Sequence, residues 1–245
     1  MQARRILILG GTSDAVELAT ELAGAGYDIV TSLAGVTTMP KLPAGRLRVG
    51  GFGGEQGLLD YLVTEQIDVV ADAAHPFAAN ISRNGFNAAR RASIGYVRLE
   101  RPAWVSQAGD QWQEASDVAK AASMVPQSSR IMLTIGRKEI APFIERGDLS
   151  GVVRMIEKPA CHLPERWHLI LARPPYDLAG EISILENHRI TVLVTKNAGG
   201  VQTQAKLAAA RHLGLPVILI SRPEKPTSLT CASAQAVVEA IGLRN

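Results

Sequence analysis

The chain opens on a short apolar run that stops at two glycines and continues as an amphipathic helical pattern. Residues 6–9 are all isoleucine or leucine, Gly10 and Gly11 follow, and apolar residues recur at helical spacing over 15–22. This order predicts a buried parallel strand, a tight turn and a helix start, which together bind phosphate groups. The stretch 10–15 lacks the full G-x-G-x-x-G fingerprint of dinucleotide sites, so a strand–helix unit without a ligand is the alternative.

The same alternation continues through the first hundred residues. It predicts a parallel sheet with right-handed crossover connections. Aromatic residues make up only 4% of the chain, so the core must rest on Ala, Val, Leu and Ile, which suits buried parallel strands. The expected strands are 5–9, 27–33, 46–49, 67–71 and 96–99, and the expected helices are 14–23, 55–65 and 79–92.

A second alternating set follows a boundary-like stretch at 101–110. Its expected strands are 130–135, 152–156, 168–172, 190–195 and 216–221, and its expected helices are 116–124, 139–146, 177–186, 202–213 and 233–241. We therefore expect an α/β fold with two Rossmann-like parallel-sheet domains and the active site in the cleft between them. Residues 1–104 form the nucleotide-binding domain and 105–245 the domain that completes the substrate cleft, although the last helix could pack on either half.

Charge and cysteine content exclude several classes of protein. The net charge is +3, and no run of Lys or Arg is long enough for a nucleic-acid-binding arm. The two cysteines, Cys161 and Cys231, have no metal-site spacing and suit a reducing compartment. No apolar stretch approaches the length of a membrane span. We expect a cytoplasmic protein that needs no metal and binds neither nucleic acid nor membrane.

The ends of the early strands carry the residues expected to meet a ligand, because ligands of parallel sheets bind beyond the carboxyl ends of the strands. His75-Pro76 follows the fourth expected strand, and four glycines surround Phe52 within 50–54. The second strand ends in Thr31-Ser32-Leu33, without the Asp or Glu that holds the ribose 2′-hydroxyl of NAD. NADPH is therefore preferred over NADH, with Lys41, Arg46 or Arg48 supplying charge for the 2′-phosphate.

In the second half of the chain, glycines again follow the expected strands, and here cationic residues accompany them. Gly136-Arg137-Lys138 follows one expected strand, and Lys196 precedes Gly199-Gly200 at the end of another. Cations at strand ends favour a polyanionic small molecule, although solvated surface charge is the alternative. These cations are Arg98, Arg101, Arg137, Lys138, Arg173, Lys196 and Arg222.

Six segments, taken in order and spacing, closely resemble the precorrin-6A reductases of cobalamin biosynthesis. The segments are 9–14, 72–78, 98–104, 133–137, 195–200 and 220–223; His-Pro-Phe-Ala and Thr-Lys-Asn-Ala-Gly-Gly are the most specific parts. The resemblance implies NADPH-dependent reduction of one double bond of a polycarboxylated corrin precursor, giving precorrin-6B. A cobalt-containing analogue is used in the anaerobic branch, and neighbouring pathway enzymes are candidate partners for hand-over of the substrate.

These considerations assign roles to individual residues. His75 and Lys196 are the candidate proton donors; a loop-shaping role for His75 and a surface position for Lys196 are the alternatives. Asp14 is expected to cap its helix. Cofactor-binding candidates are Gly10, Gly11, Thr12, Ser13, Asp14, Ser32, Gly51, Phe52, Thr134, Gly136, Arg137 and Lys138. Substrate-binding candidates are Arg101, Lys196, Asn197 and Arg222.

Two other functions stay open at this point. A reductase of another anionic substrate would share the opening motif without needing the His-Pro-Phe-Ala and Thr-Lys-Asn segments. A non-catalytic NADPH sensor would bind the nucleotide without turnover and would not need a cation-rich second half. A nucleic-acid binder fits least, because no basic stripe with interleaved aromatics is present.

Overall fold

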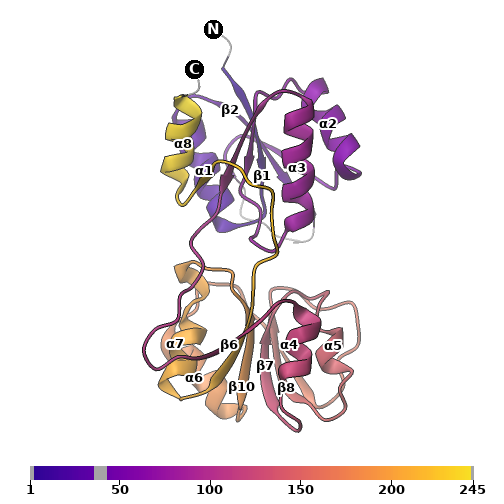
Figure 1. Ribbon diagram of the computed structural model, residues 1–245, viewed down its shortest axis with the longest axis vertical. Helices are drawn as coiled ribbons and strands as arrows, with labels where there is room; N and C mark the ends of the chain where they lie inside the picture. Colours follow the sequence, from indigo (N-terminus) through magenta and orange to yellow (C-terminus); the bar gives the residue numbers. More distant parts are fainter. Residues whose placement is uncertain (1–2, 36–42, 244–245) are drawn as a thin grey trace. The chain divides into compact units, whose positions relative to one another are not determined.

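The computed structural model describes residues 3–35 and 43–243, and the chain divides into two compact units (Figure 1). The first unit combines Met1–Pro102 with Glu224–Asn245, and the second is Ala103–Pro223. Each unit holds one six-stranded sheet in which all strand pairs are parallel. The α/β class and the two parallel-sheet domains predicted from the sequence are confirmed.

The sheet of the first unit has the order β12-β5-β4-β1-β2-β3. Helices α1 and α8 cover one face, and α2 and α3 cover the other (Figure 1). The elements are β1 (Arg5–Leu9), α1 (Ser13–Gly24), β2 (Asp28–Leu33), β3 (Arg46–Val49), α2 (Gly54–Thr64), β4 (Val69–Asp72), α3 (Ala79–Arg91), β5 (Gly95–Leu99), β12 (Thr230–Cys231) and α8 (Ala234–Gly242).

Strand β1 explains why the chain begins with an unbroken apolar run. Ile6 and Ile8 pack into the core under α1 and α8, whereas Leu7 and Leu9 pack into the core under α2 and α3. Because successive side chains of a strand point to opposite faces, a strand covered on both sides must be apolar at every position. All four side chains are at most 1% exposed.

The sheet of the second unit has the order β6-β11-β10-β7-β8-β9. Helices α6 and α7 pack together on one face, and α4 packs beside α5 (Figure 1). The elements are β6 (Gln111–Ala115), α4 (Val118–Met124), β7 (Arg130–Thr134), α5 (Ala141–Ile144), β8 (Ser150–Met155), β9 (Trp167–Leu171), α6 (Leu178–Asn187), β10 (Val192–Lys196), the 3₁₀ turn η1 (Val201–Thr203), α7 (Ala205–His212) and β11 (Pro216–Ile220).

The structure differs from the predicted domain division at the C-terminal end. Residues 224–245 were assigned to the second domain, yet β12 pairs with β5 and α8 packs on α1. The physical reason is the apolar stripe of α8, whose Ala234, Val237 and Ile241 complete the core of the first unit.

Within the residues described, no helix is long and apolar enough to span a membrane.

Candidate functional site

The loops after β1 and β4 meet at the point where the strand order of the first sheet reverses. From β1 the chain moves to β2 and β3, whereas β4 and β5 lie on the other side of β1. The hydroxyl of Thr12 donates to the carbonyl of Ala73 at 2.9 Å and ties the two loops together. Ligands of open α/β sheets bind at this kind of reversal, so residues 10–14 and 73–75 occupy the expected place.

Residues 11–14 form a cradle of main-chain N–H groups. Thr12 is the N-cap of α1, and its side chain accepts the N–H of Ala15 at 3.1 Å. Within the described part of the chain, no acceptor takes the N–H groups of residues 11–14. Gly11 has φ +110°, and a Cβ there would meet nothing within 4 Å, so the cradle is open. The residues present therefore fit a nucleotide phosphate.

Asp14 does not have the capping role expected from the sequence, because Thr12 caps the helix. Its carboxylate lies in the first turn of α1 and accepts the Ser13 hydroxyl at 3.3 Å. It also pairs with Arg101, whose Nη1 lies 2.6 Å from Asp14 Oδ2. Arg101, a predicted substrate ligand, is thus placed beside the cradle in its own unit.

Arg48 lies at the carboxyl edge of β2 and β3, beside Ser32. Its Nη1 donates to the Ser32 hydroxyl at 3.2 Å and to the Gly50 carbonyl at 2.6 Å, and its Nη2 donates to the Gly51 carbonyl at 2.9 Å. The guanidinium carbon lies 3.7 Å from the centre of the Phe52 ring. These contacts hold the guanidinium plane against the ring next to the end of the second strand.

The other two candidates for the 2′-phosphate do not share this position. Arg46 opens β3 at the opposite edge of the sheet, where it pairs with Asp28 at 3.8 Å and Glu65 at 3.4 Å. Lys41 lies outside the described residues. Of the described candidates, Arg48 is the one at the ligand edge.

A buried polar group fixes the loop that carries His75. Asp72 accepts the N–H of Ala74 at 3.1 Å and the hydroxyl of Tyr96 at 2.7 Å, and Arg98 Nε lies 3.6 Å from the same carboxylate. Burial raises the pKa of the Tyr96 hydroxyl, and the charge of Asp72 raises it further, so Tyr96 stays a hydrogen-bond donor.

His75 takes part in shaping its own loop. The main-chain N–H of Phe77 donates to Nδ1 of His75 at 3.2 Å, and the carbonyl of His75 accepts the N–H of Ala78 at 2.7 Å. In this arrangement Nδ1 is an acceptor and the ring offers Nε2–H as a donor. This geometry supports the alternative in which His75 shapes its loop. Because Nδ1 accepts a hydrogen bond, it carries no proton to donate to a substrate.

The second sheet reverses its order between β7 and β10, and Lys196 ends β10 at this point. Its Nζ pairs with the carboxylate of Glu139, a residue that the sequence analysis did not select. Gly136 lies against this pair, because a Cβ there would stand 2.5 Å from Glu139 Oε2 and 3.8 Å from Lys196 Nζ. The sequence signal that could have indicated Glu139 is its position three residues after Gly136, in the turn that follows β7.

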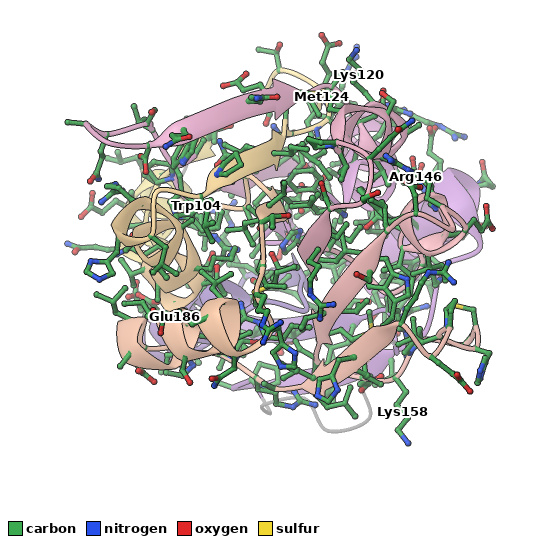
Figure 2. All side chains as sticks on the ribbon, turned by 90° about the horizontal axis from the view of Figure 1, so that it is seen from below. Trp104, Lys120, Met124, Arg146, Lys158 and Glu186 are labelled. Carbon is green, nitrogen blue, oxygen red and sulfur yellow. The ribbon has the colours of Figure 1, made fainter. Side chains whose placement is uncertain are left out.

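Other predicted residues of the second unit hold its loops. Asn197 accepts the N–H of Trp104 at 2.8 Å and donates to its carbonyl at 3.1 Å. Trp104 is labelled in Figure 2, and the centre of its ring lies 4.7 Å from Nζ of Lys206. Arg222 donates to the carbonyl of Asn197 at 2.9 Å. Arg137 pairs with Glu157 at 3.1 Å. Of the remaining candidates, Thr134 donates to the carbonyl of Val194 at 3.4 Å, and Lys138 is exposed.

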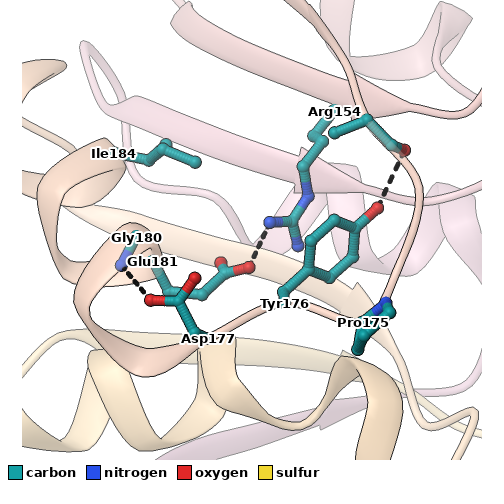
Figure 3. A pocket seen from close by; sticks show the side chains of 8 residues that line it. Arg154, Pro175, Tyr176, Asp177, Gly180, Glu181 and Ile184 are labelled. Carbon is teal, nitrogen blue, oxygen red and sulfur yellow. Dashed lines mark hydrogen bonds and ion pairs between the residues drawn. The ribbon is translucent and has the colours of Figure 1, made fainter.

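A small cavity of about 110 Å³ lies where β8 and β9 end and α6 begins (Figure 3). The guanidinium of Arg154 pairs with Glu181 and lies 3.8 Å from the centre of the Tyr176 ring. The hydroxyl of Tyr176 donates to the carbonyl of Ala172 at 2.9 Å. None of these residues was a candidate on sequence grounds. Among the residues described, no cluster of three or more His, Cys, Asp or Glu side chains could hold a metal ion.

Comparisons with known proteins agree on one family. The model of the precorrin-6x reductase CbiJ/CobK family matches residues 5–242. A Rhodococcus erythropolis protein named precorrin-6A reductase is 47% identical over 224 residues, which cover 91% of this chain and 90% of that protein. A Priestia megaterium protein named cobalt-precorrin-6A reductase is 31% identical over 252 residues, which cover 96% and 97%. A solved structure described as CobK precorrin-6A reductase matches with a TM-score of 0.93 and 39% identity, over 99% of this chain and 97% of that one. The chain belongs to the precorrin-6x reductase CbiJ/CobK family.

Proposed function

We propose that this chain reduces one double bond of precorrin-6A to give precorrin-6B, with NADPH as the hydride donor. The observation that carries the proposal is the open cradle of N–H groups at residues 11–14, which lies at the reversal point of the first sheet. The cobalt-free substrate is favoured over its cobalt analogue, because the protein named for the first is 47% identical and the protein named for the second 31%.

NADPH supplies the hydride when it is bound, and the chain supplies binding, orientation and charge. The cradle at 11–14 holds the diphosphate through main-chain N–H groups. Arg48 would bind the 2′-phosphate, since its guanidinium lies beside Ser32 near the end of β2, where an NAD-specific site would carry an acid. A fixed arginine in this place favours NADPH over NADH.

The second unit contributes cations that suit a substrate with many carboxylates. Lys196 binds such a carboxylate or delivers the proton that accompanies the hydride, and Glu139 orients its ammonium group. Arg137, Asn197 and Arg222 fix the surrounding loops, and the two arginines add positive charge. The role of His75 in this proposal is to shape the loop beside the cofactor, with Nε2–H as a donor.

The test is oxidation of NADPH by the purified chain with precorrin-6A, followed by absorbance. Parallel reactions contain NADH instead of NADPH, or cobalt-precorrin-6A instead of precorrin-6A. We expect turnover with NADPH and precorrin-6A and slower reactions in both parallels. NADPH binding without oxidation of any substrate would favour the sensor, and oxidation with another polyanion alone would favour a different reductase. Absence of nucleotide binding would refute the proposal at the cradle itself.

A further inference from the structure

A negative side chain stands directly beside the proposed phosphate site. Asp14 is the second residue of α1, and its carboxylate lies in the same turn as the unpaired N–H groups of residues 11–14. A carboxylate in the first turn of a helix stabilises that helix through the helix dipole. For an incoming diphosphate the same carboxylate is a like charge at close range, and it opposes binding.

Arg101 is placed to cancel this charge. It follows β5, two strands away from β1 in the order β5-β4-β1, and its side chain contacts the first turn of α1. Its Nη1 lies 2.6 Å from Asp14 Oδ2, and the side chains are 20% and 30% exposed. Partial burial weakens the screening of this pair by water, so the cancellation is stronger than on an open surface.

We infer that Arg101 is a positioning residue of the nucleotide site: by pairing with Asp14 it neutralises the one carboxylate in the first turn of α1 and so sets the affinity for the diphosphate. The inference rests on the proposed function and gives Arg101 a role distinct from the substrate contact predicted from the sequence. The ligand concerned is the diphosphate of a dinucleotide. The affinity of the site for it depends on the charge balance between Asp14 and Arg101, which lie far apart in the chain.

A double-mutant cycle on the full chain tests the inference through the dissociation constant of NADPH, measured by fluorescence titration at low salt without substrate. Arg101→Met exposes the carboxylate and should raise the Kd by about tenfold or more. Asp14→Asn removes the carboxylate that offsets the positive charge of Arg101, so the site becomes more positive and the Kd should fall by a few fold. The double variant Asp14→Asn/Arg101→Met should return to within about threefold of the wild-type Kd, because the two effects cancel.

Two further measurements separate this role from a structural one. Raising the ionic strength should shrink the difference between Arg101→Met and wild type, because salt screens the unpaired carboxylate. Arg101→Lys keeps the charge and should bind NADPH more tightly than Arg101→Met. Thermal melting without nucleotide checks that each variant is folded, and the milder Arg101→Gln replaces Arg101→Met if the latter does not fold.

A matched control removes a cation from the opposite edge of the same sheet. Arg46→Met takes away a positive charge that pairs with Asp28 and Glu65, and it should leave the Kd within about twofold of wild type. Wild-type affinity in Arg101→Met would overturn the inference. So would a double variant that binds as weakly as Arg101→Met, because Arg101 would then act on the nucleotide independently of Asp14. Failure of the wild-type chain to bind NADPH would refute the proposed function instead.

Discussion

At the scale of single residues, Arg48 is the group that should separate the two nicotinamide cofactors. Arg48→Ala removes a guanidinium held by Ser32, Gly50, Gly51 and the Phe52 ring. Loss of charge-assisted hydrogen bonds to the 2′-phosphate should raise the KM for NADPH by about tenfold to a hundredfold and leave the KM for NADH nearly unchanged. Steady-state kinetics with both cofactors measure this. An equal rise for both would mean that Arg48 supports the loop without reading the phosphate.

Lys225 should make the free energy of unfolding depend on pH in the alkaline range. Burial lowers the pKa of its ammonium, and the charges of Asp72 and Glu100 only partly oppose the shift. The native state therefore releases the proton at lower pH than the unfolded state, so the free energy of unfolding should rise as pH increases through the native pKa towards the ordinary value of about 10.4. Urea denaturation between neutral and alkaline pH measures the rise. Lys225→Met should flatten it, and an identical profile in that variant would assign the rise to another group.

At the scale of elements, the buried pair between β8 and α6 should show strong coupling. Arg154 and Glu181 have side chains 3% and 1% exposed, and Oε2 of Glu181 has no partner within the described residues. Arg154→Met leaves a buried carboxylate unpaired and should cost about 3–5 kcal/mol of unfolding free energy, most of which Arg154→Met/Glu181→Leu should restore. Asp148→Asn, which breaks an exposed pair with Arg146, should cost less than about 1 kcal/mol. Equal costs in the two single variants would contradict this reading.

The elements that the sequence predicted are those whose pattern is local. Strands such as β1 and β11 follow from unbroken apolar runs, and the cradle follows from the glycines after β1. Strand β6 was missed because Gln111, Gln113 and Glu114 are polar and exposed at the sheet edge, where one side of the strand has no neighbour. Strand β12 was missed because it has only two residues.

The expected helix 202–213 begins instead as a 3₁₀ turn at Val201–Thr203, and the expected helix 139–146 is reduced to Ala141–Ile144. Site residues were missed where the partner is remote in sequence. Glu139 pairs with Lys196 over 57 positions, and Arg154 pairs with Glu181 over 27. No local spacing signals such a pair, because tertiary structure alone brings the two charges together.

At the scale of the whole molecule, the two units should differ in their need for the last residues of the chain. A chain that ends at Pro223 keeps every element of the second unit but loses β12 and α8 from the first. Ala234, Val237 and Ile241, each at most 3% exposed, would leave the core beside α1. Hydrogen exchange should then show protected amides in β7 and β10 and rapid exchange in β1 and β2. Protection of β1 equal to that in the full chain would contradict this prediction.

The return of the chain to its first unit also orders events during synthesis. Nascent domains generally fold as units, and the N-terminal one usually comes first. Here the second unit is one continuous stretch that is complete once Pro223 has left the ribosome, while the first still lacks its final strand and helix. The order is therefore reversed: the second unit can mature first, and the first unit matures only after β12 and α8 have left the ribosome. Until then its exposed apolar surface beside α1 is the part of the chain that chaperones would have to protect.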